Sequence, residues 1–206
     1  MTEPSAPTPA QVLEILREGN RRFATNAPSL ADRSPQRRAA LQGGQSPHTA
    51  VLCCSDSRVP PEIVFDQGLG ELFVVRTAGH VVDDVALGSL EYAVEHLHVP
   101  LILVLGHDGC GAVTSACSPE HEGTPAPLAR VLQALEPAVR AAAAGLASTR
   151  QAQDAHALVD LAVRTNIELV VERLRADEVI ARVLAEGTLR VAGARYDLGS
   201  GLVHFL

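Results

Sequence analysis

Length, composition and charge already exclude several kinds of protein. With 206 residues, 47% of them hydrophobic, the chain is long enough to bury one core, and we predict a single domain over residues 1–206. Its net charge of -7 argues against a nucleic-acid-binding surface. No stretch reads as a signal peptide or a membrane span, so we predict a cytoplasmic protein, in which the four cysteines favour metal binding over disulfides.

The segment in front of the core is predicted to be a helical arm. Residues 1–8 carry polar residues and prolines without an apolar centre, which predicts a disordered tail. Apolar residues then recur at helical spacing over residues 9–26, and a short helix is expected over residues 36–41. The predicted N-terminal helical arm therefore covers residues 9–47.

The next segment alternates predicted strands with predicted helices. Strands are expected at residues 49–53, 72–75 and 101–105. The last is an uninterrupted apolar run, which is typical of a strand that is covered on both faces. A helix is expected from Asp83 to Leu97, with its acidic residues at the N-terminus, and a short one after Pro60. This alternation predicts βαβ units and a mainly parallel sheet.

The second half of the chain is mostly helical until its last strands. Helices are predicted at residues 127–147, 156–174 and 177–185. In the first of these, Pro137 predicts a break and Gly145 a stop. Strands at residues 188–194 and 202–206, joined by a turn sequence, predict an antiparallel edge. The predicted fold class is α/β, with a mainly parallel central sheet flanked by helices, an antiparallel edge at the C-terminus and the N-terminal helical arm.

Three metal-binding side chains follow two of the predicted buried strands. Cys54 comes after the first strand, and His107 and Cys110 come after the third. The carboxyl ends of parallel strands meet at one edge of a sheet, where such sheets bind ligands. Zn²⁺ prefers thiolate and imidazole ligands in tetrahedral geometry, and a catalytic site keeps three protein ligands and one position for water. We therefore predict one zinc ion per chain, held by Cys54, His107 and Cys110.

Asp56 and Arg58 lie two and four residues beyond Cys54. In an extended segment, side chains two residues apart face the same side, so these three would share one pocket. Asp56 would accept a hydrogen bond from a water in the zinc site, and Arg58 would keep the carboxylate ionised. A structural ion pair at a strand end is the alternative interpretation.

The two motifs resemble those of the β-class carbonic anhydrases. They are Cys-Ser-Asp-Ser-Arg at residues 54–58 and Gly-His-Asp-Gly-Cys-Gly at residues 106–111, and the similarity extends from Leu16 to Leu198. The resemblance implies zinc-dependent, reversible hydration of carbon dioxide to bicarbonate and a proton, by attack of zinc-bound hydroxide. It also implies self-association as a homodimer or homotetramer, with no nucleic-acid and no membrane partner.

The resemblance further assigns roles to single residues. Asp56 and Arg58 match the catalytic Asp–Arg pair of the family. Gly111 matches a glycine whose amide faces substrate, and Gln67 lies near a substrate-binding glutamine of the family, although Gly68 aligns there more directly. Regulated members carry a tryptophan at the position of Val51, and because this chain has no tryptophan, we expect no bicarbonate regulation of that type.

Three functions remain open from the sequence. The first is hydration of carbon dioxide, with activity rising into mildly alkaline pH because two thiolates offset the charge of zinc. The second is hydrolysis of carbonyl sulfide or carbon disulfide, which relatives with the same three ligands perform. The third is a zinc-stabilised or bicarbonate-sensing protein, against which the presence of Asp56 and Arg58 argues. His80 is a candidate proton shuttle, since the ordinary pKa of histidine suits that task.

Overall fold

The computed structural model describes residues 7–29, 31–118 and 124–206. Residues 1–6 of the predicted disordered tail lie outside this description. Thr8, at the end of that predicted tail, is the N-cap of the first helix, where its side chain and that of Gln11 form a capping box. None of the helices in the described part of the chain combines the length and apolar character needed to cross a membrane.

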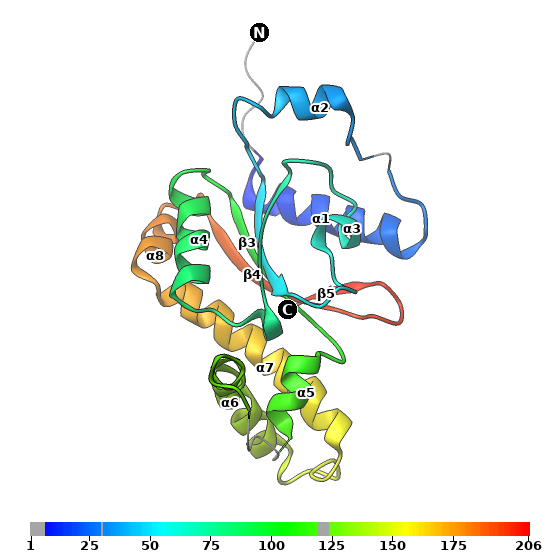
Figure 1. Cartoon of the computed structure of the whole chain (residues 1–206), viewed down its shortest axis with the longest axis vertical. Helices are drawn as coiled ribbons and strands as arrows, with labels where there is room; N and C mark the ends of the chain where they lie inside the picture. The colour runs from blue at the N-terminus through cyan, green and yellow to red at the C-terminus, as the bar shows by residue number, and fades with distance from the viewer. Residues whose placement is uncertain (1–6, 30, 119–123) are drawn as a thin grey trace.

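A central sheet organises the described residues (Figure 1). Its strands are β1 (Thr49–Cys54), β2 (Leu72–Thr77), β3 (Leu101–His107), β4 (Arg190–Tyr196) and β5 (Val203–Phe205). They lie in the order β2-β1-β3-β4-β5. β1 pairs in parallel with β2 and β3, β3 pairs in parallel with β4, and β5 runs antiparallel to β4. The predicted α/β fold, with a mainly parallel sheet and an antiparallel C-terminal edge, is confirmed.

Helices cover both faces of this sheet, as Figure 1 shows. They are α1 (Pro9–Ala24), α2 (Pro35–Ala40), α3 (Pro61–Val64), α4 (Asp84–Glu95), α5 (Gly111–Cys117), α6 (Ala126–Leu146), α7 (Ala155–Ala176) and α8 (Glu178–Ala185), with a 3₁₀ turn, η1, at Ala78–His80. One core lies between the sheet and α1 and α3, and it contains Cys53. The other lies between the opposite face and α4, α7 and α8, and it contains Cys54. Adjacent cysteines on a strand therefore point to opposite faces, as strand geometry requires.

Asn20 fastens the predicted helical arm to the sheet of its own chain. Its side chain is 4% exposed. The amide nitrogen donates to the carbonyl oxygens of Val64 (3.1 Å) and Gly201 (2.8 Å), and the amide oxygen accepts from the backbone N–H of Val203 (2.8 Å). One buried side chain thus joins α1, α3 and the last strand.

The predicted break at Pro137 is wrong, because Pro137 lies inside the continuous helix α6. Proline removes one backbone hydrogen bond, to the carbonyl four residues earlier. Both Pro137 and Gln133 are exposed, so that carbonyl can be hydrated. The buried face of the helix, formed by Leu132, Leu135 and Ala138, packs on the core and holds the helix together across the proline. The helix ends at Leu146, one residue beyond the predicted stop.

Candidate metal centre

Three metal-binding side chains converge at the carboxyl ends of β1 and β3. Cys54 is the last residue of β1, His107 is the last residue of β3, and Cys110 is the N-cap of α5. One ligand atom from each lies within 4.8 Å of the other two, and all three residues are buried. The two sulfurs are 3.8 Å apart. The structure thus brings together the three residues that the sequence predicts as zinc ligands.

The imidazole of His107 is oriented with one nitrogen free for a metal. Its Nδ1–H donates to the carbonyl oxygen of Asp108 (2.9 Å), and since a carbonyl can only accept, Nε2 carries the lone pair. Nε2 is buried and has no hydrogen-bond partner among the described residues. A buried nitrogen without a partner is costly. A metal ion at this point would satisfy it, and a bond from the other ring nitrogen to a carbonyl is the usual arrangement of a histidine ligand.

Backbone amides surround both sulfurs. The amides of Asp56 and Gly79 point at the Cys54 sulfur, the latter from 3.4 Å, and those of Ala112 and Val113 point at Cys110. Without a metal, the hydrogen bond between the two thiols lowers the pKa of Cys54 and raises that of Cys110. Amide donors of this kind stabilise thiolate charge. Two such sulfurs and one imidazole nitrogen form a donor set that fits Zn²⁺ with one coordination position left over.

A short loop after β3 sets the spacing between His107 and Cys110. The Asp108 backbone N–H donates to the carbonyl of Tyr196 (3.2 Å), and the Asp108 carboxylate accepts from the backbone N–H of Leu198 (2.7 Å). Gly109 has a φ of 57°, in the left-handed region that glycine adopts without strain. The end of β4 therefore fixes the turn that aims both ligands at one point.

Asp56 and Arg58 form a pair at the mouth of this cluster. The guanidinium donates two bonds to the carboxylate, Nε to Oδ1 (2.9 Å) and Nη2 to Oδ2 (2.7 Å), and the Arg58 backbone N–H adds a third to Oδ1 (2.9 Å). These bonds hold the pKa of Asp56 well below its usual range. Oδ2 of Asp56 also lies 3.9 Å from Nε2 of His107.

The stretch after Cys54 does not stay extended, which was the condition on which the side chains of Cys54, Asp56 and Arg58 were expected to share one pocket. Residues 57 and 58 form a turn, closed by a bond from the Val59 N–H to the Asp56 carbonyl (3.0 Å). The aspartate side chain bonds its own backbone two residues on, which is a common way for aspartate to initiate a turn. The turn, and not strand alternation, places Arg58 on Asp56.

Arg76 and Gly79 also build the site, although the sequence pattern did not single them out for it. Arg76 donates from Nε to the Cys54 carbonyl (3.1 Å) and from Nη2 to the Asp56 carbonyl (2.6 Å), so it fixes the backbone between ligand and carboxylate. Gly79 contributes only its amide. Contacts made by backbone groups leave no signal in side-chain spacing, which is why they were missed.

The other predicted site residues lie as follows. A Cβ built on Gly111 would meet no atom within 4 Å, so this glycine faces open space next to Cys110. Gln67 is buried, with its amide nitrogen on the Phe65 carbonyl (2.7 Å) and its oxygen on Nε2 of His48 (2.9 Å). These contacts within the described residues do not bring Gln67 to the three ligands.

His80 does not have the surroundings that a proton shuttle needs. The residue is 0% exposed, and its Nε2 is bonded to the side-chain amide of Asn166 (2.8 Å). Burial lowers the pKa of His80 to about 4, so the ring is neutral at physiological pH. A shuttle must exchange protons with solvent, and this ring is sealed from it.

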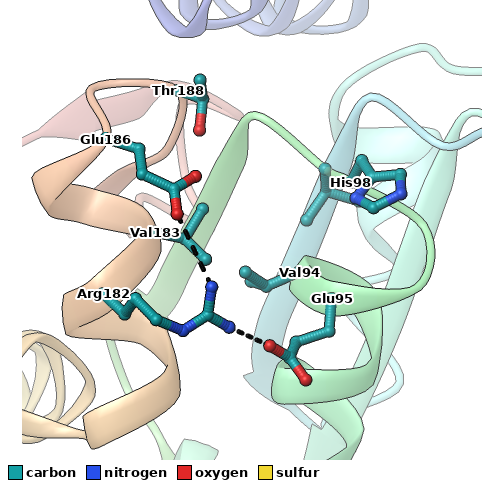
Figure 2. A pocket seen from close by; sticks show the side chains of 8 residues that line it. Val94, Glu95, His98, Arg182, Val183, Glu186 and Thr188 are labelled. Carbon is teal, nitrogen blue, oxygen red and sulfur yellow. Dashed lines mark hydrogen bonds and ion pairs between the residues drawn. The ribbon is translucent and has the colours of Figure 1, made fainter.

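A separate hollow lies at the opposite end of the sheet, between α4 and α8 (Figure 2). Arg182 crosses it and pairs with Glu95 on one side and Glu186 on the other. The two carboxylates are therefore neutralised by the protein itself. In the described part of the chain, the only group of three or more side chains with metal-binding geometry is Cys54, His107 and Cys110.

Comparison with known protein sequences agrees with this geometry. The family described as "Carbonic anhydrase" matches residues 49–203. Carbonic anhydrase 2 of Mycobacterium tuberculosis is 41% identical over 196 residues, which cover 94% of this chain and 90% of that protein. A carbonic anhydrase of Mycolicibacterium smegmatis is 41% identical over 198 residues, which cover 95% of this chain and 92% of that protein.

Comparison of the fold with solved structures also finds β-carbonic anhydrases. A tetrameric β-carbonic anhydrase from the filamentous ascomycete Sordaria macrospora matches with a TM-score of 0.77 and 28% identity, covering 95% of this chain and 96% of that one. The β-carbonic anhydrase of Coccomyxa, solved in complex with acetazolamide, matches with a TM-score of 0.76 and 31% identity, covering 94% and 86%. On its sequence, its fold and its cluster of two cysteines and one histidine, the chain belongs to the β-carbonic anhydrase family.

Proposed function

We propose that this protein catalyses the reversible hydration of carbon dioxide to bicarbonate and a proton, using one zinc ion per chain. The observation that carries the proposal is the buried cluster of Cys54, His107 and Cys110: two sulfurs and one ring nitrogen lie within 4.8 Å of one another, and Nε2 of His107 has no hydrogen-bond partner among the described residues. When bound, zinc lowers the pKa of a water molecule so that a nucleophile is available near neutral pH.

Asp56 and Arg58 are proposed to orient the reacting O–H group and to keep the open coordination position free. Arg58 keeps Asp56 ionised, so the carboxylate is a hydrogen-bond acceptor and never a donor at working pH. From Oδ2, it would accept a hydrogen bond from a reacting O–H group and so turn the oxygen lone pair towards carbon dioxide. The bidentate bond also holds the carboxylate back from the ligands, because both of its oxygens are engaged by Arg58.

The substrate contacts belong to the same proposal. Gly111 is proposed to let substrate approach the backbone closely, since no side chain fills the space at its Cα. Gln67 is proposed as a substrate contact only because its position in the sequence is close to that of a substrate-binding glutamine in the family. Its buried bond to His48 would then fix the orientation of its amide.

Self-association and location complete the proposal. The Sordaria macrospora relative is tetrameric, and we infer a homodimer or homotetramer for this chain. The sheet is consistent with this, because neither edge strand, β2 or β5, has a neighbouring strand on its outer side in the described sheet. A cytoplasmic location is proposed because the four cysteines are free and the two ligand thiols must stay reduced to bind zinc.

The proposal is tested by carbon dioxide hydration in a stopped-flow instrument on protein of measured zinc content. Cys54→Ser is expected to lose zinc and activity together, and Asp56→Asn to keep zinc but lose activity by roughly 100-fold, the scale of a misplaced reacting group. Cys117→Ser is the matched control, because Cys117 is a free, half-buried cysteine outside the cluster, and this variant should keep both. Full activity in Cys54→Ser would remove the proposed site.

The same zinc-quantified sample decides between carbon dioxide and its sulfur analogues. Turnover of carbonyl sulfide and carbon disulfide is measured beside carbon dioxide hydration. The proposal expects carbon dioxide to have the highest kcat/KM. If a sulfur analogue is turned over faster, the zinc centre stands but the substrate assignment is wrong.

A further inference from the structure

Two buried polar side chains next to the zinc ligands have no part in the proposed chemistry. Asn166, on α7, is 4% exposed, and His80, on η1, is 0% exposed. Burying an amide and an imidazole is unfavourable unless their polar atoms are hydrogen-bonded. Their bonds should therefore show what they are for.

Asn166 uses both hydrogens of its amide nitrogen on the η1 turn. Nδ2 donates to the Gly79 carbonyl (3.1 Å) and to Nε2 of His80 (2.8 Å). Because a nitrogen that donates to Nε2 requires a lone pair there, the neutral ring carries its proton on Nδ1, which is buried without an acceptor among the described residues. Two bonds from one side chain thus fix both the backbone and the imidazole of a single turn.

The turn needs to be held, because its backbone is strained. Gly79 has a φ of 66° and His80 a φ of 46°. Glycine adopts this left-handed region freely, but a residue with a Cβ does so at a cost and persists there only when its surroundings determine it. The His80 ring also packs closely on Gly106: a Cβ added to that glycine would lie 3.2 Å from Cε1 of His80.

The held turn points a hydrogen-bond donor at a zinc ligand. The Gly79 N–H donates to the Cys54 sulfur at 3.4 Å. Cys110 receives its amides from the first turn of the helix that it caps, but Cys54 depends for this bond on a turn that follows another strand. A donor on a thiolate withdraws charge from the sulfur and so weakens its donation to a metal.

We propose that Asn166 is a positioning residue for the metal centre: through Gly79 it holds an N–H against the Cys54 sulfur and so limits the electron donation of that thiolate to zinc. The inference rests on the zinc centre of the proposed function and assigns to that centre an outer partner on a distant helix. Losing the bond makes the sulfur a stronger donor, which leaves zinc less able to acidify water.

The test uses Asn166→Asp, which keeps the size of the side chain but has no N–H, and Asn166→Leu, which removes its polarity. In cobalt-substituted protein, the sulfur-to-cobalt charge-transfer band should move to longer wavelength in both variants. In zinc protein, kcat for carbon dioxide hydration at pH 7 should fall roughly tenfold, the scale typical of outer-shell changes. Its rise with pH should move to higher pH.

Val163→Ala is the matched control. Val163 is 0% exposed on the same helix and in the same core, so its truncation loosens packing without touching the hydrogen bonds. It should lower the melting temperature while leaving the band and the pH profile in place. The inference is overturned if both Asn166 variants keep the wild-type band and profile, if Val163→Ala shifts them equally, or if neither Asn166 variant folds. Wild-type protein without zinc would instead overturn the proposed function.

Discussion

Each of the three residues of the candidate metal centre is oriented by backbone groups. A carbonyl fixes His107, the amides of a helix start surround Cys110, and two backbone amides reach Cys54. Outside this shell, a guanidinium holds the carboxylate of Asp56 by two bonds. The reactivity of the site is therefore controlled by a few hydrogen bonds whose removal should change activity without removing zinc.

Arg58→Gln is expected to lower carbon dioxide hydration by on the order of 100-fold, the scale of a misplaced reacting group, while zinc stays bound. The released carboxylate can then turn towards Nε2 of His107, which is 3.9 Å from Oδ2, and compete for the open coordination position. Stopped-flow rates and zinc analysis measure both effects. Arg140→Gln, which breaks an exposed Arg–Glu pair on α6, is the control and should be neutral. Equal rates in the two variants would contradict the role of Arg58.

The pH profile is expected to rise through neutrality into mildly alkaline pH. Arg58 depresses the pKa of Asp56, so the carboxylate is ionised at every pH above that depressed value and does not limit activity on the acid side. The limit comes from water at zinc, for which the reference pKa is about 7, and two thiolates shift it upwards. The measurement is kcat from roughly pH 6 to 9, centred on that reference. A flat profile over this range would contradict the assignment.

At the scale of elements, buried polar side chains join segments that hydrophobic packing alone would leave free to slide. Asn20 joins α1 to α3 and β5 by three hydrogen bonds. Arg22 and the Ser29 backbone N–H both bond the Asp66 carboxylate, at 2.6 Å and 2.8 Å. The arm is therefore fixed in position by specific contacts with its own chain.

Asn20→Leu is expected to lower the free energy of unfolding by about 3 kcal/mol, because it leaves the buried Val64 carbonyl and the part-buried Gly201 carbonyl and Val203 N–H without the partner that Asn20 gives them. Urea denaturation measures the change. Glu14→Ala, at an exposed position on the same helix, should stay within about 0.5 kcal/mol of the wild type. A loss as small as that of the control would mean that Asn20 does not hold the arm.

The order and type of most elements, and the meeting of Cys54, His107 and Cys110 in one cluster, could be predicted from the sequence. Apolar runs are visible because β1 and β3 are buried on both faces. The ends of strands are harder to predict. β4 runs from Arg190 to Tyr196, so it ends two residues after the predicted strand at residues 188–194 and includes Arg195. That arginine breaks the apolar pattern, but its charge is paired with Asp160 of α7 at 2.7 Å, so the strand continues. Tertiary pairing of this kind has no local signature.

At the scale of the whole molecule, the two edge strands of the sheet differ in length and direction. β5 forms one edge as an antiparallel strand of 3 residues and β2 forms the other as a parallel strand of 6 residues, and neither has a strand on its outer side in the described residues. Beside β2 on α4, Val85 is 78% exposed, and Tyr92 is 48% exposed, with its ring tilted at 34° to that of Phe73 of β2 and the two ring centres 6.2 Å apart. An open strand edge flanked by apolar side chains is a surface suited to self-association.

Light scattering after size-exclusion chromatography is expected to give at least a dimer. Val85→Glu should shift the population towards monomer, because a charge would be buried in the contact. Leu128→Glu is the control, since Leu128 is 50% exposed on α6, away from that edge. A monomeric wild type, or equal dissociation of both variants, would exclude β2 and α4 as the contact.

The pairing of Cys53 with Leu105 across β1 and β3 has a practical consequence. Slipping one strand by a single residue would turn Cys54 to the opposite face of the sheet, away from His107. Metal binding at this site therefore indicates that β1 and β3 are paired in the correct register. Metal content can serve as an inexpensive assay of correct folding for any core variant of this protein, and it requires no substrate.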